Sequence, residues 1–260
     1  MSEYRPSHIG CGCSTLADMA RYRPEGLETG GVYHLLNRTV ERRPAFQDVP
    51  DHKRFLSLLA YCQWPRSLGY AHAKRLFRAP RAKDSSPEGN APLIDVLSYC
   101  LMPTHFHLLV QQRNERGVSH FMQRVLNSYT RYFNTRHVRP GPLFAGGFRS
   151  VRVSTDHQLL HVMRYIHLNP YAAGLTDDPF SYPWSSVRAY TAHFPTEQRS
   201  RDPFSRPQPR VDVLPPLNTD LIRAMLPAPQ YTRFILDHAA HARELERIKH
   251  LLFLESQEAA

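Results

Sequence analysis

The chain has 260 residues, 42% of them hydrophobic, and its 33 Lys and Arg residues outnumber 23 Asp and Glu residues, giving a formal net charge of +10. This length allows one substantial domain with additions, and the apolar content suffices for a core and argues against disorder throughout. No apolar run approaches the ~20 residues that cross a bilayer, and residues 1–10 lack the apolar segment of a signal peptide, so a soluble intracellular chain is expected. The basic excess suits a polyanionic partner, because neutralising phosphates releases counterions.

The cysteines indicate a reducing compartment. Cys11, Cys13, Cys62 and Cys100 lack the framework spacing of small disulfide-rich secreted domains. We therefore expect a cytoplasmic protein with free thiols.

The N-terminal half predicts a tail, a strand and a helix in that order. Residues 1–29 mix Pro, Gly, Ser and charge without periodicity, and the β-favouring run 31–38 predicts a strand inside a sheet. After Pro50, apolar residues at i, i+3, i+4 and i+7 predict an amphipathic helix packed on that sheet; these are Phe55, Leu58, Leu59 and Cys62. Basic residues beside Pro, Ser, Gly and Asn then predict a mobile insertion near 71–91.

The central part predicts a hairpin followed by helix, strand and helix. Residues 93–102 and 105–110 are β-like runs separated by Pro103-Thr104, which predicts adjacent antiparallel strands. Residues 118–136 predict a basic amphipathic helix, residues 143–153 predict a strand, and Thr155 or Asp156 can cap a helix over 157–168 that stops near Asn169-Pro170.

The C-terminal part predicts a Pro-rich linker over 191–217 and a helical extension over 218–260, with a charged helix at 231–253. The order strand, helix, strand, strand, helix, strand, helix predicts an α+β fold, in which helices pack on an antiparallel-rich sheet.

His105-Phe106-His107 is the sharpest local feature. Alternate strand residues share a face, so both imidazoles point the same way and form half of a metal site, while Phe106 can anchor the strand in the core. A His-x-His pair in an arbitrary strand is nevertheless more often structural than metal-binding.

Tyr165 and Asn169 share a helical face, so a phenol and an amide oxygen can converge on one point and supply a nucleophile and a third ligand. Each residue also has an ordinary structural interpretation. Tyr165 can be an aromatic residue at the edge of the core, and Asn169 can end a helix before proline. His157 and His161 lie on the same helical face, where additional ligands or proton carriers would also lie. A structural role or a contact with DNA is the preferred interpretation of both.

Three motifs follow one another along the chain: LMPTHFHLLV at 101–110, YTRYFN at 129–134 and YIHLNPYAAGL at 165–175. Together they resemble the REP-associated tyrosine transposases, which belong to the HUH nucleases. Asn37-Arg38, residues 42–46 and residues 183–186 extend the likeness over roughly 30–190, the expected catalytic domain.

This resemblance implies a ferredoxin-like core, a divalent cation (Mg²⁺ or Mn²⁺) held by His105 and His107 with help from Asn169, and Tyr165 as nucleophile. The implied activity is that of an endonuclease and strand transferase in DNA transposition or repeat processing. Single-stranded or hairpin DNA carrying palindromic repeats would be cleaved and joined through a 5′-phosphotyrosine intermediate, by a monomer or homodimer at the nucleoid.

Arginines are the expected DNA contacts, because a guanidinium group binds phosphates bidentately and stacks on bases. The candidates are Arg38, Arg131, Arg136, Arg139, Arg149 and Arg152.

Two positions depart from the family pattern. Thr104 stands where relatives commonly have Asn, and Gly147 stands where a phosphate-contacting Arg is usual. Two alternatives therefore stay open: a non-catalytic DNA-binding regulator that retains the fold, and a hydrolase whose metal activates water, although no set of acidic ligands accompanies the histidines.

Overall fold

The computed structural model of the chain describes residues 26–65, 91–191 and 214–258, with the side chains of 247–258 left aside. Most of the predicted tail, the basic insertion and most of the Pro-rich linker lie outside these residues. None of the described helices is both long enough and apolar enough to cross a membrane.

The described part of the chain forms one four-stranded antiparallel sheet with the order β2-β3-β1-β4. Its strands are β1 (Val32–Arg38), β2 (Ile94–Met102), β3 (His105–Gln112) and β4 (Arg149–Val153). With helices after β1 and β3, this is the β-α-β-β-α-β arrangement of ferredoxin-like folds. The predicted α+β class and the interior position of the first strand are confirmed.

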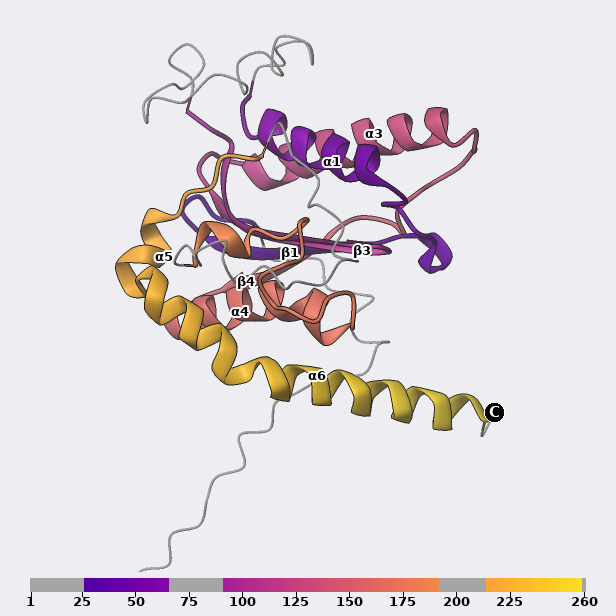
Figure 1. Cartoon of the computed structure of the whole chain (residues 1–260). Helices are drawn as coiled ribbons and strands as arrows, with labels where there is room; N and C mark the ends of the chain where they lie inside the picture. The colour runs from indigo at the N-terminus through magenta and orange to yellow at the C-terminus, as the bar shows by residue number, and fades with distance from the viewer. Residues whose placement is uncertain (1–25, 66–90, 192–213, 259–260) are drawn as a thin grey trace, which may run out of the picture.

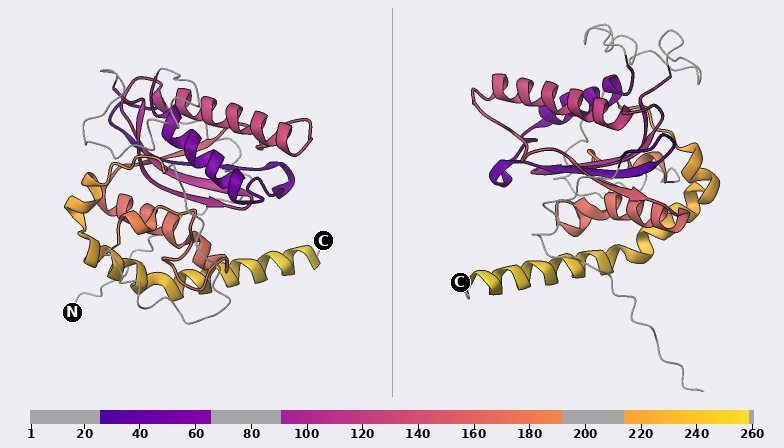
Figure 2. Two further views of the ribbon diagram at one scale, coloured as in Figure 1. Left: turned by 45° about the horizontal axis from the view of Figure 1, so that its top comes forward. Right: turned by 180° about the vertical axis from the view of Figure 1, so that it is seen from behind.

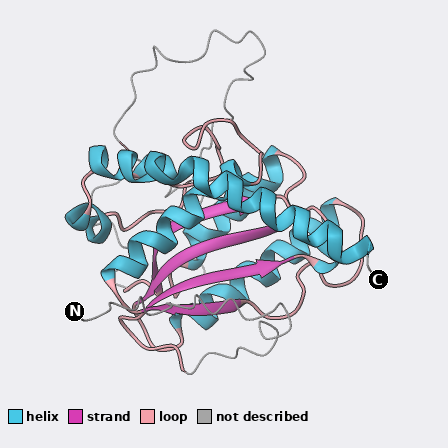
Figure 3. Cartoon of the chain, turned by 90° about the horizontal axis from the view of Figure 1, so that it is seen from below, coloured by secondary structure: helices cyan, strands magenta, loops and turns pink. Residues whose placement is uncertain are grey.

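Helices cover both faces of the sheet (Figures 1 and 2). On one face lie α1 (Val49–Cys62) and α3 (Gly117–Arg136); on the other lie α4 (Asp156–Ala172) and the long α6 (Ala228–Glu258), which follows the short α5 (Asp220–Met225). From below, helices cross in front of the four strands (Figure 3). Two short 3-10 turns, Val40–Arg42 and Val187–Ala189, complete the described elements.

Local sequence explains α1 and the core beneath it. The Asp48 carboxylate accepts a hydrogen bond from the Asp51 amide at 3.1 Å, and Pro50 occupies the first turn, where a missing amide hydrogen costs little. The predicted apolar stripe of α1 is buried. Phe55 of this stripe packs edge-on against Tyr129 of α3 and lies 5.0 Å, between ring centroids, from Phe106 of β3.

Strand alternation divides β3 between two environments. Phe106 is fully buried on the face covered by α1 and α3, so His105 and His107 turn to the face covered by α4. Register pairs Arg38 with His105 and Leu36 with His107, which brings β1 residues of the same face beside both histidines.

The last strand is shorter than predicted. It begins at Arg149 rather than near residue 143, because Gly146 adopts a φ of +76°, which extended backbone does not accommodate. Leu143 and Phe144 are buried before that bend, and Phe144 forms an isolated bridge with Thr39.

Helix α4 runs past the predicted stop at Asn169-Pro170. Pro170 lies inside its last turn, where it removes only one backbone hydrogen bond, and the helix ends at Ala172. Gly174, with a φ of +69°, reverses the chain, and the Leu175 amide donates to the Pro170 carbonyl at 2.9 Å. Asn169 is therefore held in helical geometry and does not terminate the helix.

Candidate active site

Two imidazoles of β3 and one phenol of α4 meet on the sheet face that α4 covers. The rings of His105 and His107 are 5.0 Å apart between centroids, and that of Tyr165 lies 5.5 Å from His107. His107 is buried, whereas Tyr165 is 50% exposed. A half-exposed phenol beside the buried His107 imidazole can contact a bound macromolecule while it lies against this histidine.

Asn169 lies one turn beyond Tyr165 on α4. Its side-chain Nδ2 donates to the Tyr165 carbonyl at 2.9 Å. This hydrogen bond uses the amide nitrogen and leaves the amide oxygen, the atom that a cation would take. The structure thus places Asn169 beside the tyrosine on the helix, as its spacing predicts, and among the described residues its side chain makes no hydrogen bond with either strand histidine.

His34 of β1 is a site residue that sequence reasoning missed. Its Nε2 lies 2.9 Å from Nδ1 of His107, and the two rings are stacked with centroids 5.1 Å apart and planes 20° apart. The Tyr165 ring lies 6.1 Å from the His34 ring. The position of His34 follows from the β1–β3 pairing, which no local pattern in the sequence indicates.

Burial keeps these imidazoles neutral. Loss of hydration lowers the pKa of His34 and that of His105 to about 4, with the Arg38 guanidinium contributing at His105. Burial and the neighbouring His34, His105 and Arg38 lower the pKa of His107 well below its ordinary value. Neutral imidazole is the form that ligates metal ions.

The strand histidines fit a divalent cation. The Nε2 atom of His107 is buried and makes no hydrogen bond within the described residues, although nearly all buried polar atoms in proteins have a partner. A lone pair on Nε2 that points toward a cation would account for the missing hydrogen-bond partner of this atom. The described segments contain no group of three His, Cys, Asp or Glu side chains placed to hold a metal. The Asn169 oxygen, water or phosphate would have to complete the ligand set.

The predicted DNA-contacting arginines divide between the two faces of the sheet. Strand alternation and register place Arg38 and Arg149 on the face of His105 and His107. Arg152 lies on the opposite face and pairs with Glu28 at 2.7 Å.

The other three arginines lie on or just after α3. Arg131 is exposed on this helix, across the sheet from the histidines. Arg139 donates to the Asn134 side chain at 2.9 Å and to the Pro142 carbonyl at 2.8 Å. These positions stay predicted contacts, on a surface separate from that of Tyr165.

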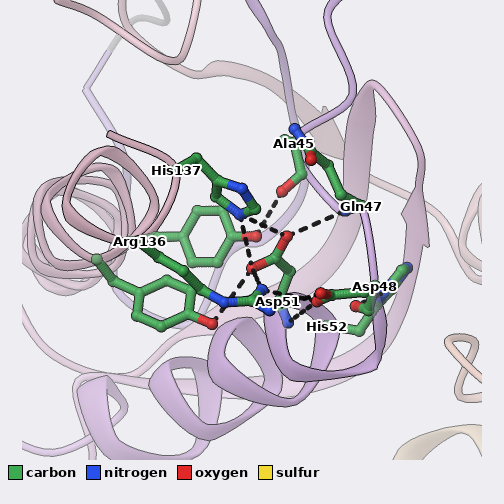
Figure 4. Close-up of polar contacts among 9 residues, drawn as sticks. Ala45, Gln47, Asp48, Asp51, His52, Arg136 and His137 are labelled. Atoms are coloured by element: carbon green, nitrogen blue, oxygen red, sulfur yellow. Dashed lines mark hydrogen bonds and ion pairs between the residues drawn. The ribbon is translucent and has the colours of Figure 1, made fainter. Parts of the chain in front are cut away.

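Arg136 is part of a polar cluster that ties α1 to α3 (Figure 4). Its guanidinium binds the carboxylates of Asp48 and Asp51, and its hydrogen bonds to Asp48 lower the pKa of that carboxyl group. The fully buried Asp51 also meets Tyr132, the His137 ring and the Gln47 amide. These contacts give Arg136 a structural role, because a buried carboxylate such as that of Asp51 requires charged or hydrogen-bonding partners.

A buried network joins α4 to the C-terminal extension. On α4, His167 is fully buried, and its ring nitrogens lie 2.6 Å from the Tyr231 hydroxyl of α6 and 2.8 Å from the Ser186 hydroxyl. Arg164, one residue before Tyr165, contacts Nδ1 of His238 at 2.7 Å and covers the Phe234 ring. These contacts fix the helix that carries the tyrosine.

His157 and His161 begin the same helix. Their Nε2 atoms are 3.0 Å apart, and Nδ1 of His161 accepts from Arg164 at 2.8 Å. Accepting at Nδ1 leaves the proton of neutral His161 on Nε2, so this nitrogen offers no lone pair to a metal. His157 and His161 therefore belong to the group of contacts that joins α4 to α6 through Arg164.

Comparison with known proteins gives one family match within the chain. Residues 90–169 match the family model described as "Transposase IS200 like". No curated protein matches the chain.

Two solved structures are similar to the chain. One is a REP-associated tyrosine transposase bound to a REP hairpin, with 13% identity, a TM-score of 0.44 and coverage of 66% of this chain and 85% of that one. The other is a putative transposase from Deinococcus radiodurans, with 14% identity, a TM-score of 0.31 and coverage of 56% and 95%. The segment that matches this family model, residues 90–169, contains His105, His107, Tyr165 and Asn169.

Proposed function

We propose that this protein cleaves and rejoins single-stranded or hairpin DNA through a covalent bond to Tyr165. The observation that carries the proposal is the half-exposed Tyr165 ring, 5.5 Å from a buried neutral imidazole with an unpaired nitrogen. The motif resemblance favours palindromic repeat DNA as substrate, in the cytoplasm at the nucleoid.

His105, His107 and the Asn169 oxygen are the residues that would hold Mg²⁺ or Mn²⁺. Such a cation, when bound, polarises a phosphate oxygen and stabilises the charge that develops there. Imidazole nitrogen favours Mn²⁺ relative to an all-oxygen site, and cellular abundance favours Mg²⁺.

Tyr165 performs the covalent step. Its phenolic oxygen attacks the scissile phosphorus, the new bond forms a 5′-phosphotyrosine, and the departing oxygen becomes a 3′-hydroxyl. The phenolic proton passes to solvent, and the leaving oxygen takes up a proton in return. One phosphodiester replaces another, so the reverse attack by a 3′-hydroxyl joins strands without ATP.

Arg38 and Arg149 hold the DNA backbone on the same face. Arg38 lies on β1, next to the strand of His105 and His107, and Arg149 lies on β4, on the other side of β1. Guanidinium groups bind phosphates with paired hydrogen bonds. They position the strand so that the scissile phosphate meets Tyr165.

A non-catalytic DNA-binding regulator is the second candidate, and Gly147 favours it. This glycine stands where related sequences usually carry an arginine, and a Cβ added to it would meet no atom within 4 Å. The regulator would bind the same DNA and form no covalent bond.

Adduct trapping separates the two candidates. Labelled single-stranded and hairpin repeat DNAs are incubated with the full chain and Mg²⁺ or Mn²⁺, then resolved under denaturing conditions. Wild type should give a protein-DNA adduct and a fragment ending in a 3′-hydroxyl, and Tyr165→Phe should give neither. Tyr171→Phe, on the same helix, is the matched control and should retain both products. DNA binding without adduct on every repeat tested would favour the regulator.

A further inference from the structure

Among the described residues, the His107 side chain makes one hydrogen bond, and its partner is the His34 imidazole. It comes from Nε2 of His34 to Nδ1 of His107, at 2.9 Å, between rings stacked at 20°. Both side chains are at most 9% exposed. The contact is therefore shielded from solvent and cannot readily be exchanged for a water molecule.

The sheet fixes this contact. His107 pairs with Leu36 in the antiparallel register, so His34, two residues earlier on β1, is its diagonal neighbour on the same face. β1 itself lies between β3 and β4, which holds the His34 backbone on both sides. The position of the His34 ring is thus built into the most constrained strand of the sheet.

Only one distribution of protons suits a metal ligand here. A cation at Nε2 of His107, the nitrogen without a partner, requires the proton of that neutral ring to sit on Nδ1. Nδ1 then donates to Nε2 of His34, which must accept and carry its own proton on Nδ1. Metal-ligating histidines commonly donate their second ring nitrogen to such a partner, which sets tautomer and orientation.

We infer that His34 is a positioning residue, whose Nε2 accepts the Nδ1 proton of His107 and so presents Nε2 of His107 to a divalent cation. This inference rests on the proposed function and adds a residue outside the matched segment 90–169. It also leaves His34 outside the ligand set, since its Nε2 is already engaged by His107.

Metal binding by the full chain, without DNA, tests the inference separately from cleavage. The probe is Mn²⁺, with free ion measured by electron paramagnetic resonance. His34→Leu removes the acceptor at similar volume, and His34→Gln keeps an acceptor at the end of the side chain. His120→Ala, which removes an exposed histidine of α3, is the matched control.

We expect His34→Leu to weaken Mn²⁺ binding roughly 10- to 100-fold, the usual effect of removing such a partner. His34→Gln should bind within a few-fold of wild type, and His120→Ala should match it. Equal Mn²⁺ affinity in wild type and His34→Leu, with both folded by circular dichroism, would overturn the inference and leave the proposed function standing. If His34→Gln lost as much Mn²⁺ affinity as His34→Leu, the role of His34 as hydrogen-bond acceptor would also be overturned.

Nitrogen-15 NMR of the metal-free chain provides a readout that a purely structural role would not move. His107 should carry its proton on Nδ1 in wild type and in His34→Gln, and should lose this preference in His34→Leu. A proton on Nε2 of His107 in wild type would overturn the inference whether or not the enzyme cleaves DNA. Wild type that binds Mn²⁺ and forms no adduct would instead contradict the proposed function alone.

Discussion

Tyr165 of α4 presents its ring edge-on to His107 of β3, with 84° between the ring planes and 5.5 Å between centroids. Both residues belong to one chain, and the helix that carries the tyrosine is joined to α6 of that same chain. Within one copy of the chain, the candidate nucleophile therefore lies beside a candidate metal ligand.

This arrangement predicts that the active site works in cis. A mixture of His105→Ala and Tyr165→Phe chains should form no more adduct than either chain alone, because each copy lacks one part of its own site. The measurement is adduct yield across mixing ratios, with a wild-type and Tyr165→Phe mixture as the positive control. Adduct recovered in the mixture of the two inactive variants would show that tyrosine and histidines come from different subunits.

Removal of a strand histidine should affect cleavage far more than DNA binding. His105→Ala and His107→Ala are each expected to lower the cleavage rate by about 100- to 1000-fold, the usual effect of losing a charge-stabilising group at a reacting centre. Affinity for DNA should change little, because phosphate contacts by arginine supply most of it. Single-turnover cleavage and fluorescence anisotropy on one hairpin give the two quantities. If the cleavage rate and the DNA affinity fell together, the histidines would instead serve DNA binding or folding.

Arginine substitutions should reveal which face of the sheet the DNA covers. Arg38→Ala and Arg149→Ala should weaken DNA binding and reduce the slope of log affinity against log salt by about one each, since each contact releases about one counterion. Arg131→Ala, across the sheet, should have the smaller effect. Anisotropy titrations at several salt concentrations provide the slopes, and a larger change for Arg131→Ala would place the DNA on the α3 face.

The Tyr231 hydroxyl should stabilise the helix that carries Tyr165. Tyr231→Phe leaves the buried His167 nitrogen without its partner at 2.6 Å, which should lower the free energy of unfolding by about 1–3 kcal/mol. Urea denaturation measures this free energy. Tyr171→Phe, whose hydroxyl makes no hydrogen bond within the described part of the chain, should stay within ~0.5 kcal/mol of wild type. An equal loss of stability in both variants would show that the hydrogen bond between His167 and Tyr231 has no special stabilising role.

His52 should make the protein less stable in mild acid. Its ring is stacked on Trp184, and burial lowers its pKa below the ordinary value, against the opposing effects of Asp48 and Asp51. Because the unfolded state then binds the proton more readily, stability is full above about pH 6.5 and falls as pH decreases toward the folded-state pKa. One proton changes the free energy of unfolding by at most about 1.4 kcal/mol per pH unit.

Urea titrations in EDTA between pH 7.5 and pH 5 provide the check. His52→Gln should show a shallower decline than wild type, although its stability at pH 7.5 is lower. An unchanged slope would show that His52 does not carry the proton.

Local patterns were sufficient where a residue's role depends on its own element. The spacing of Phe55 and Leu59 predicted α1, Pro103-Thr104 marked the turn between β2 and β3, and alternation placed His105 and His107 on one face. The interval between Tyr165 and Asn169 correctly put them on one helical face, although their proposed roles came from the family resemblance.

Contacts between distant elements were beyond the reach of those patterns. His34 meets His107 only because β1 inserts beside β3, and His167 meets Tyr231 only because α6 returns to α4. The helix stop was placed too early because Pro170 is tolerated in a last turn and the left-handed Gly174 is the true signal.

The central position of β1 also determines when the sheet can close during synthesis. Leu36 pairs with His107 on one side and with Arg149 on the other, so the first strand to leave the ribosome has partners only in segments made much later. Such distant pairing slows folding, because long loops must close, at a cost in entropy, before the paired strands make stabilising contacts. Until β4 emerges, one edge of β1 lacks its strand partner, and unpaired edges are where nascent chains associate wrongly. The strand that carries His34 is thus the last of the described strands to acquire both neighbours. Tyr165 follows β4 in the chain, so it can reach His107 only after all four strands have been synthesised.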